Sequence, residues 1–279
     1  MNDNMILLEN FVQYLCDNEK SDKTIEAYNS DIKQFLDYNK NIKLHDIKNK
    51  DLKDYKEFLL YNKLLEPTSV NRKLVAIHQF LIFNEIVART KKVKVQEQQF
   101  INNLINKKDI DKLIRTAMIK KDIRTQALIL TGYLTGARIS EILQIKSKDI
   151  NNNVIRILGK GSKFRNLYIP KKLNEVWNQY YNSNKRYKKS DYLFTGQRGK
   201  MTRKGADYIL KKYSELSGVP KEKCHFHNLR HAFVVKSLLE KKLNITIVQS
   251  LVGHQSIQTT AGYSRVTEEE LLELIDDLD

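Results

Sequence analysis

Apolar residues recur at helical spacing in four segments within about the first 85 positions. In MILLENFVQYLC, for example, apolar side chains return every three or four residues, as on the buried face of an amphipathic helix. Ser21 and Thr24 mark the start of the second segment, and Pro67 stands just before the fourth. Four short helices of this kind predict a small helical bundle. The segments are residues 5–16, 24–38, 46–61 and 68–83.

The periodicity stops after the fourth segment. Residues 89–103 (RTKKVKVQEQQFINN) are polar, basic and aperiodic, which is typical of a linker. We therefore expect an N-terminal helical domain over residues 1–90, a linker over 91–103 and a C-terminal domain over 104–279.

Helical spacing resumes at residues 109–118 and 123–134. Thr135 and Gly136 break the second of these helices, and Arg138 opens a short one that runs to about Leu143. Arg138 is thus expected at a helix start, where backbone N–H groups also favour an anion.

Two strand-like runs, residues 154–158 and 164–169, flank a turn of sequence GKGSK and predict a β-hairpin. Glycine on both sides of Lys160 lets this side chain project from a tight turn. Thr202 caps a basic helix further along the chain. The expected fold class is therefore mainly α with a small β-sheet, an α+β arrangement in two domains.

The last 13 residues predict one more helix, which begins at Thr267. It is acidic on one side and carries Leu271, Leu272, Leu274 and Ile275. A helix this short is marginal alone, so it needs a groove to pack against.

Charge is distributed unevenly along the chain, whose formal net charge is +16. Residues 101–266 carry 33 basic and 11 acidic side chains, and residues 267–279 carry seven acidic and no basic ones. Such a basic middle is the electrostatic footprint of a polyanion partner. An AT-rich genome, whose proteins are high in lysine and asparagine, explains abundant lysine. It does not explain the concentration of lysine in one domain.

Several classes of protein are excluded by simple counts. Cys16 and Cys224 are the two cysteines, too few for a disulfide framework, and they fit a reducing cytoplasm. No stretch approaches the roughly 18 apolar residues of a membrane span. The N-terminus lacks the basic start of a signal peptide.

Side chains suited to phosphodiester chemistry gather in residues 225–265. Arg230 can bind two phosphate oxygens with its planar fork. His227 and His254 can donate hydrogen bonds or move protons near neutral pH. Tyr263 can act as a nucleophile on phosphorus. Each residue alone has an ordinary structural explanation, and the ordered set is what favours a site.

Five motifs in order carry a resemblance to a known family. They are TGARISEIL, GKGSK between two strand-like runs, HNLRH, GH and TTAGY. This pattern resembles the tyrosine recombinase (phage integrase) family over nearly the whole chain. The short layout is most similar to the Xer recombinases and to transposon-encoded resolvases.

The resemblance implies a reaction and a nucleophile. Tyr263 would attack a DNA phosphorus and form a 3′-phosphotyrosyl link, which leads through a Holliday junction to resolution or integration of DNA. His227 would act as general base, and Lys160 as general acid to the leaving 5′-oxygen. No cofactor and no metal are implied, because arginines supply the positive charge.

The remaining implied catalytic residues surround the phosphate. Arg138 and Arg230 would stabilise the transition state, and His254 would hold a non-bridging oxygen. Glu141, one turn after Arg138, would orient that arginine; its alternative reading is an intrahelical salt bridge, and the two are compatible.

The resemblance also implies contacts to double-stranded DNA core sites. The helix that begins at Thr202 is similar to the segment that enters the major groove. The first turn of this helix, with Arg203 and Lys204, is where base edges are usually read, and Lys211 and Lys212 are expected to contact phosphates. For each N-terminal candidate, a solvated helix surface is the ordinary reading. The candidates are Lys23, Thr24, Tyr28, Lys33, Asn71, Arg72 and Lys73 in the N-terminal domain, and Arg203, Lys204, Lys211 and Lys212 in the C-terminal one.

Two other functions remain alternatives. A metal-dependent nuclease could draw zinc ligands from Cys224 and the nearby histidines His225, His227, His231 and His254. A non-catalytic DNA-binding protein on an integrase scaffold would be expected to lack catalytic positions. The expected partners are DNA and further copies of this chain in a homo-tetramer, with or without a related recombinase. The acidic tail 267–279 is expected to dock on a neighbouring copy, and no membrane is expected.

Overall fold

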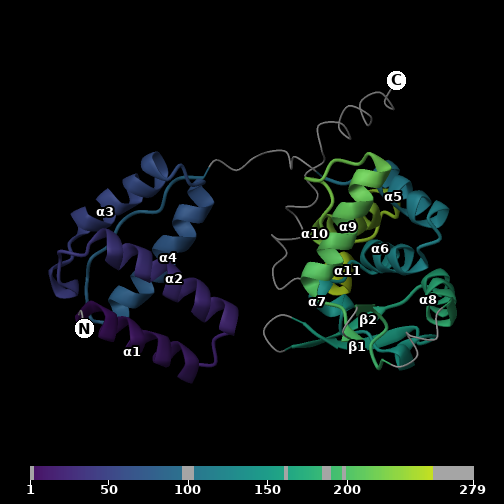
Figure 1. Ribbon diagram of the computed structural model, residues 1–279, viewed down its shortest axis with the longest axis horizontal. Coiled ribbons are helices and arrows are strands. Elements are labelled where there is room, and N and C mark those ends of the chain that lie inside the picture. Colours follow the sequence, from purple (N-terminus) through teal and green to yellow (C-terminus); the bar gives the residue numbers. More distant parts are fainter. Residues whose placement is uncertain (1–2, 96–103, 160–162, 184–189, 197–198, 254–279) are drawn as a thin grey trace. The chain divides into compact units, whose positions relative to one another are not determined.

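The computed structural model describes residues 3–95, 104–159, 163–183, 190–196 and 199–253 (Figure 1). The chain divides into two compact units, Met1–Glu97 and Gln98–Asp279. Most described residues are helical, and the strands form two small antiparallel sheets. The expected class, mainly α with a small sheet, is confirmed.

The N-terminal unit is a bundle of four α-helices around one apolar core (Figure 1). Helix α2 packs against α1 and α4, and rings such as Phe11, Phe35 and Phe80 lie buried between them. Ser21 caps α2 by accepting a hydrogen bond from the Thr24 backbone, as the sequence predicts. The helices are α1 (Asp3–Asp17), α2 (Asp22–Tyr38), α3 (Asn49–Glu57) and α4 (Pro67–Phe83).

The predicted start of the third helix, residues 46–61, is wrong, because α3 begins at Asn49. A 3-10 turn, η1 (Leu44–Asp46), precedes α3, and a π-helical turn, η2 (Phe58–Asn62), follows it. The break at the start has a local cause, because the Asp51 carboxylate accepts a 2.7 Å hydrogen bond from the backbone N–H of Lys48. This one-way contact, the half of a capping box that Asp51 supplies, fixes the first turn of α3 one residue after Lys48.

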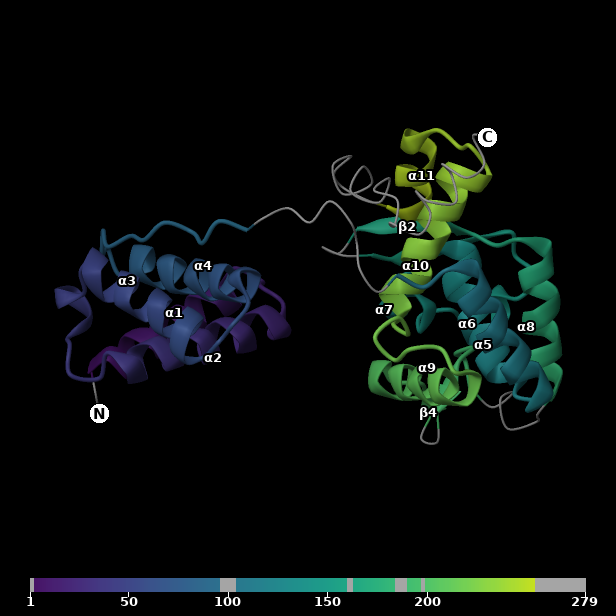
Figure 2. The ribbon, with the colours of Figure 1, turned by 90° about the horizontal axis from the view of Figure 1, so that it is seen from above.

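The C-terminal unit is built around α6 (Ile123–Thr135), which packs against α5 (Lys107–Ile119), α8 (Lys171–Ser183) and α10 (Phe226–Val235) (Figure 2). Such a central helix is apolar on nearly all sides. The buried Trp177 of α8 donates from its indole nitrogen to the Thr131 hydroxyl of α6, 2.9 Å away. This bond satisfies the polar atom of the largest buried side chain.

The predicted hairpin is present, with β1 (Val154–Leu158) paired antiparallel to β2 (Phe164–Tyr168). Its inner face carries Ile155, Ile157 and Leu167, which are buried. A second small sheet consists of β3 (Thr195–Gly196) paired antiparallel to β4 (Gly199–Lys200), each strand two residues long. It leads directly into α9 (Arg203–Ser217), which Thr202 caps as predicted by accepting from the Gly205 backbone.

The short elements complete this unit. Helix α7 (Ile139–Ile142) follows α6, and a 3-10 turn, η3 (Ser147–Asp149), precedes β1. After α10 come a π-helical turn, η5 (Lys236–Glu240), and α11 (Ile245–Val252), whose end lies against β2 (Figure 2). No helix in the described ranges has the length and apolar character needed to cross a bilayer.

Candidate active site

Three elements of the C-terminal unit meet around a cavity of about 340 Å³. The start of α7 contributes Arg138, and the N-terminal half of α10 contributes His227 and Arg230. Helix α9 closes another side with Arg203 and Asp207. The cavity therefore has more cationic than anionic side chains, and it gathers three residues that the sequence assigns to chemistry on a phosphate.

Arg138 is placed by the way α6 ends. Gly136 has a left-handed φ of 61° and terminates α6. Arg138 then adopts an extended conformation as the N-cap of α7. Because α7 has only four residues, its backbone supplies little dipole. Recognition of an anion here therefore depends on side chains rather than on the helix start that the sequence suggests.

The Glu141 carboxylate is hydrogen-bonded to Arg138 through both of its oxygens. It accepts from the Arg138 backbone N–H at 2.7 Å and from Arg138 Nη1 at 3.0 Å. The Glu141 side chain is only 1% exposed, whereas that of Arg138 is 32% exposed. The contact is the salt bridge that the sequence predicts; the role of Glu141 in orienting Arg138 stays a prediction.

A second arginine, which the sequence reasoning missed, shares Glu141. Arg165 of β2 donates from Nη2 to one carboxylate oxygen at 2.8 Å and from Nε to the other at 3.2 Å. Burial by itself raises the pKa of Glu141, but the bond to Arg165, its charge and the contacts from Arg138 outweigh it and lower the pKa. Glu141 is therefore ionised near neutral pH. The register of the predicted hairpin could have pointed to Arg165. Arg165 pairs with the buried Ile157 across the two strands, so its side chain points inward.

Arg230 is buried to 1% exposure. Nη1 donates to the carbonyl oxygen of Gly136 at 2.7 Å, and Nη2 donates to that of Val252 at 2.8 Å. These bonds join α10 to the ends of α6 and α11. Burial of a charged guanidinium is tolerated because it is hydrogen-bonded, and such an arrangement fixes the orientation of the fork.

His227 lies on α10 one turn before Arg230. Burial lowers its pKa, and the positive charges of Arg230 and Arg138 lower it further. His227 is thus neutral near pH 7 and able to accept a proton. His231, on the next turn, is more deeply buried, and its pKa falls to about 4.

Three predicted catalytic residues lie outside the described residues. They are Lys160, His254 and Tyr263, and the predicted helix 267–279 lies outside as well. Their described neighbours are informative. Gly159 and Lys163 close the hairpin stem with a 2.8 Å backbone bond, and Gly253 ends α11 with a left-handed φ of 65°.

Three of the candidate DNA contacts in the N-terminal unit are already engaged within the protein. Arg72 and Lys73 both pair with the buried carboxylate of Asp31, at 2.5 Å and 2.8 Å. Lys73 also donates to the Gln34 side chain, and Asn71 exchanges hydrogen bonds with the backbone of Val93. Arg72 is nevertheless 53% exposed, so it is paired and still on the solvated helix surface, whereas Lys73 is 15% exposed. Lys23 and Lys33 are exposed, and Thr24 and Tyr28 are half-buried.

The candidate contacts on α9 are all exposed: Arg203, Lys204, Lys211 and Lys212. Arg203 lies 3.8 Å from Asp207, one turn away, in an exposed pair of the kind that contributes little to stability. Helix α9 therefore presents a basic face next to the cavity.

The possible zinc ligands do not form a metal site in the part of the chain that the structure describes. No group of three or more His, Cys, Asp or Glu side chains is arranged there to hold an ion. Cys224 is buried, and burial raises the pKa of its thiol, which disfavours the thiolate that zinc requires. The nuclease alternative thus gains no support.

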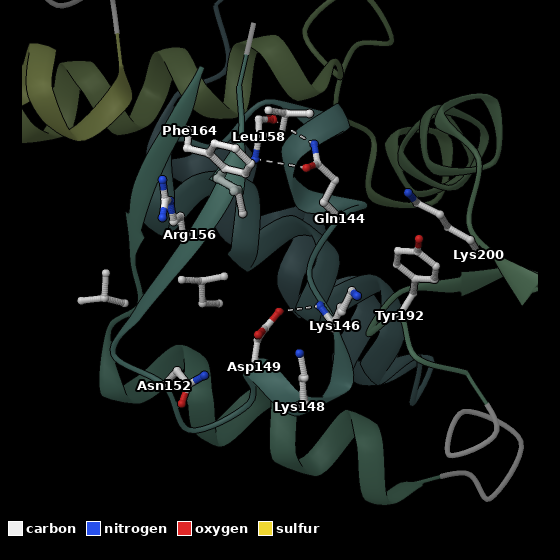
Figure 3. A pocket seen from close by; sticks show the side chains of 13 residues that line it. Gln144, Lys146, Lys148, Asp149, Asn152, Arg156, Leu158, Phe164, Tyr192 and Lys200 are labelled. Atoms are coloured by element: carbon white, nitrogen blue, oxygen red, sulfur yellow. Dashed lines mark hydrogen bonds between the residues drawn. The ribbon is translucent and has the colours of Figure 1, made fainter. Parts of the chain in front are cut away.

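A second cavity, of about 480 Å³, lies on the outer face of the β1–β2 hairpin (Figure 3). Gln144 exchanges hydrogen bonds with the Leu158 backbone at one end, and Arg156 stacks over the Phe164 ring at 4.7 Å. At the other end Lys200 stands over the Tyr192 ring at 4.3 Å. The cavity is separate from the residues around Arg138 and Arg230, and two of its four cations, Arg156 and Lys200, rest on aromatic faces.

Comparisons with known proteins agree with this architecture. The Phage integrase family matches residues 103–270, and the Phage integrase N-terminal SAM-like domain matches residues 8–85. The chain is 30% identical to a "Tyrosine recombinase" of Pseudothermotoga lettingae, over 98% of each chain. It is also 30% identical to "Tyrosine recombinase XerC" of Staphylococcus epidermidis, over 90% of this chain and 89% of the relative.

Among solved structures, the fold resembles that of XerH site-specific recombinase bound to palindromic difH substrate in a post-cleavage complex. The TM-score is 0.74, with 20% identity, over 90% of this chain and 79% of that chain. This likeness concerns the fold, while the family matches concern the sequence along most of its length. The chain therefore belongs to the phage integrase family, the tyrosine recombinases.

Proposed function

We propose that this chain is a site-specific DNA recombinase that cuts and rejoins strands through a 3′-phosphotyrosyl intermediate and a Holliday junction. The observation that carries the proposal is the convergence of Arg138, His227 and Arg230 on one cavity within a strongly basic unit. Two guanidinium groups and a neutral imidazole are what the transition state of a phosphodiester transfer needs.

The reaction divides into balanced steps. The Tyr263 oxygen attacks phosphorus, and the bond to the 5′-oxygen breaks. His227 accepts the phenol proton, and Lys160 donates one to the leaving oxygen. In the second half the 5′-hydroxyl of the partner strand attacks the phosphotyrosyl link and releases Tyr263. One diester replaces another, so no nucleotide cofactor is required.

Each side chain has a defined role in this scheme. Arg138 and Arg230 bind the non-bridging oxygens, and His254 donates to one of them. Glu141 orients Arg138. The lowered pKa of His227 keeps it neutral and ready to take the proton.

The covalent intermediate provides the test. The probe is a set of duplex fragments tiled across the DNA that flanks the gene for this chain. The unaltered chain should form an adduct that survives denaturant, and Tyr263→Phe should bind the same fragments without forming it. An adduct of normal yield with the Phe variant would disprove the assignment of the nucleophile. Activity that is lost in a chelator and restored by zinc would favour the nuclease instead.

We further propose how the chain meets DNA and its own copies. Helix α9 enters the major groove with Arg203 and Lys204, while Lys211 and Lys212 contact phosphates, as do Lys23, Thr24 and Tyr28 of the N-terminal unit. Four copies assemble on two sites in the cytoplasm. Charge supports the assembly, because the seven acidic side chains of residues 267–279 are repelled by DNA and suit a groove on a neighbouring copy.

Deleting residues 268–279 tests the assembly separately from the chemistry. Binding to a single site should change little, whereas cooperative binding to two sites should weaken. A truncated chain that forms paired-site complexes as well as the full chain would show that the tail acts within its own copy.

A further inference from the structure

Arg165 connects three parts of the C-terminal unit that carry assigned catalytic residues. Its place on β2 puts it five positions after Lys160, near the turn end of the hairpin. Nε and Nη2 bind the two oxygens of Glu141, the residue that aims Arg138. Nη1 donates to the carbonyl oxygen of Leu251, 2.7 Å away and three residues before His254. The side chain is only 12% exposed.

The charge balance around Glu141 depends on Arg165. The buried carboxylate accepts four hydrogen bonds from residues that the structure describes, two from Arg138 and two from Arg165. The Arg165 fork is bidentate, which is the stronger arrangement. Arg138 gives only Nη1 of its side chain to the same carboxylate. Arg165 thus adds a second guanidinium charge beside one carboxylate, so that Arg138, Arg165 and ionised Glu141 together carry a net charge of +1.

The second contact of Arg165 fixes the end of α11. The carbonyl oxygens of Leu251 and Val252, consecutive in the chain, accept from Arg165 and Arg230 respectively. Terminal carbonyls of a helix lack partners within the helix, and cations there are favourable. The packing is tight, since a Cβ on Gly253 would lie 2.7 Å from Cδ of Arg165. The residue just before His254 is thus held by this arginine.

The turn end of the β1–β2 hairpin also lies close to Glu141. A Cβ on Gly159 would lie 3.5 Å from Oε1 of Glu141, so the residue just before Lys160 lies close to the carboxylate that Arg165 holds. The Arg165 guanidinium thus binds Glu141 in α7 and the Leu251 carbonyl at the end of α11. Through Glu141 it also lies near Gly159, just before Lys160.

We propose that Arg165 is a positioning residue of the active site: it takes up the charge of Glu141 so that Arg138 can bind phosphate, and it ties the β1–β2 hairpin to the end of α11. The inference rests on the proposed function. Arg165 itself lies behind Arg138 and acts through it, without touching the DNA. It differs from a simple structural contact because its effect depends on the charge of Glu141.

The test uses the tiled flanking fragments and measures the single-turnover rate of adduct formation together with affinity. Arg165→Met removes the charge and keeps the length of the side chain. Its rate should fall about 100-fold, the loss expected when a catalytic group is displaced by about 1 Å. Affinity should change by less than about threefold, since one indirect contact is lost among many phosphate contacts. Arg156→Met is the matched control, because Arg156 is an exposed arginine of β1 in the same hairpin.

A charge rescue separates positioning from simple support. In the Arg165→Met background, Glu141→Gln removes the unbalanced negative charge while it keeps an oxygen for Arg138. The double variant should recover on the order of tenfold in rate over Arg165→Met, a coupling typical of contacting residues. Urea unfolding of every variant shows whether the fold is intact.

The outcomes are distinct. A near-normal rate for Arg165→Met overturns the inference. The inference also fails if Arg165→Met is slow, unfolds at lower urea and is not rescued by Glu141→Gln. If the unaltered chain forms no adduct on any fragment, the proposed function itself fails, and the inference fails with it. An adduct with the unaltered chain, a slow Arg165→Met, a normal Arg156→Met and the rescue together support it.

Discussion

The Arg230 guanidinium donates to the carbonyl oxygen of Gly136 across 2.7 Å, although 94 positions separate the two residues. Gly136 can present that carbonyl because its φ of 61° ends α6 in the left-handed region. The orientation of a buried arginine in the cavity therefore depends on the backbone of a glycine in another helix.

Substitution of Gly136 should consequently affect both stability and cleavage. An alanine Cβ there would lie 2.5 Å from Cδ1 of Phe233, in addition to the cost of the left-handed conformation. We expect Gly136→Ala to lower the free energy of unfolding by roughly 2–5 kcal/mol, the sum of backbone strain and overpacking. Urea unfolding measures this change.

Gly218→Ala is the matched control for the strain alone. Gly218 ends α9 with a φ of 70°, but a Cβ there would meet nothing within 4 Å. Its cost should be about 1–2 kcal/mol, and adduct formation should stay normal. Equal losses of stability in the two variants would contradict the role of Phe233.

Arginine-to-lysine changes test the phosphate site. Arg230→Lys should reduce the rate of adduct formation by at least about 100-fold, because a lysine cannot span two oxygens in one plane. Arg138→Lys should behave similarly. Gel-shift affinity measured on the same fragments should fall much less than the rate. Near-normal rates would place the anion site elsewhere.

The pH dependence of cleavage should reflect His227. A general base must be neutral, and burial together with Arg230 and Arg138 lowers the pKa of His227 below its usual 6.5. The rate of adduct formation should therefore stay high as the pH falls to 6.5 and decline only below it. A rate profile measured from acidic to neutral pH checks this, and His227→Gln should remove the decline along with most of the rate.

Stability should fall on acidification because of His231. Its pKa is about 4 in the folded chain, whereas the ordinary value is 6.5. The unfolded chain therefore binds more protons between these values, so this contribution is complete above pH 6.5 and is lost as the pH falls toward 4. Urea unfolding at pH 6.5 and pH 5 should show a smaller difference for His231→Gln than for the unaltered chain. An unchanged difference would mean that other groups cause the loss.

Long periodic segments could be predicted from the sequence because their faces are set locally. The helices α1, α2, α4, α5 and α6 and the β1–β2 hairpin lie where the spacing of apolar residues predicts them, to within a few residues. The interruption at Lys48 could not be foreseen, since lysine is an uncommon N-cap and the contact that starts α3 comes from Asp51. The π-helical turn η5 likewise has no local signature.

Site residues were predictable where motif order identifies them, and less so where a distant partner decides the role. Arg138, His227 and Arg230 do line one cavity. Arg165 was missed because its importance depends on Glu141, which lies 24 positions away in the sequence. Arg72 and Lys73 resemble a solvated basic surface until the fold brings Asp31 beside them.

Under the proposed function, the Asp31 contact offers a way to adjust how strongly the N-terminal unit binds DNA. The carboxylate is 4% exposed and pairs with two cations, Arg72 and Lys73, whose side chains are 53% and 15% exposed. An amide at this position would release both with one substitution, without adding any new basic residue. Each additional phosphate contact would then steepen the dependence of log affinity on log salt by roughly 0.9, so residue 31 is a point at which the grip on DNA can be tuned independently of cleavage.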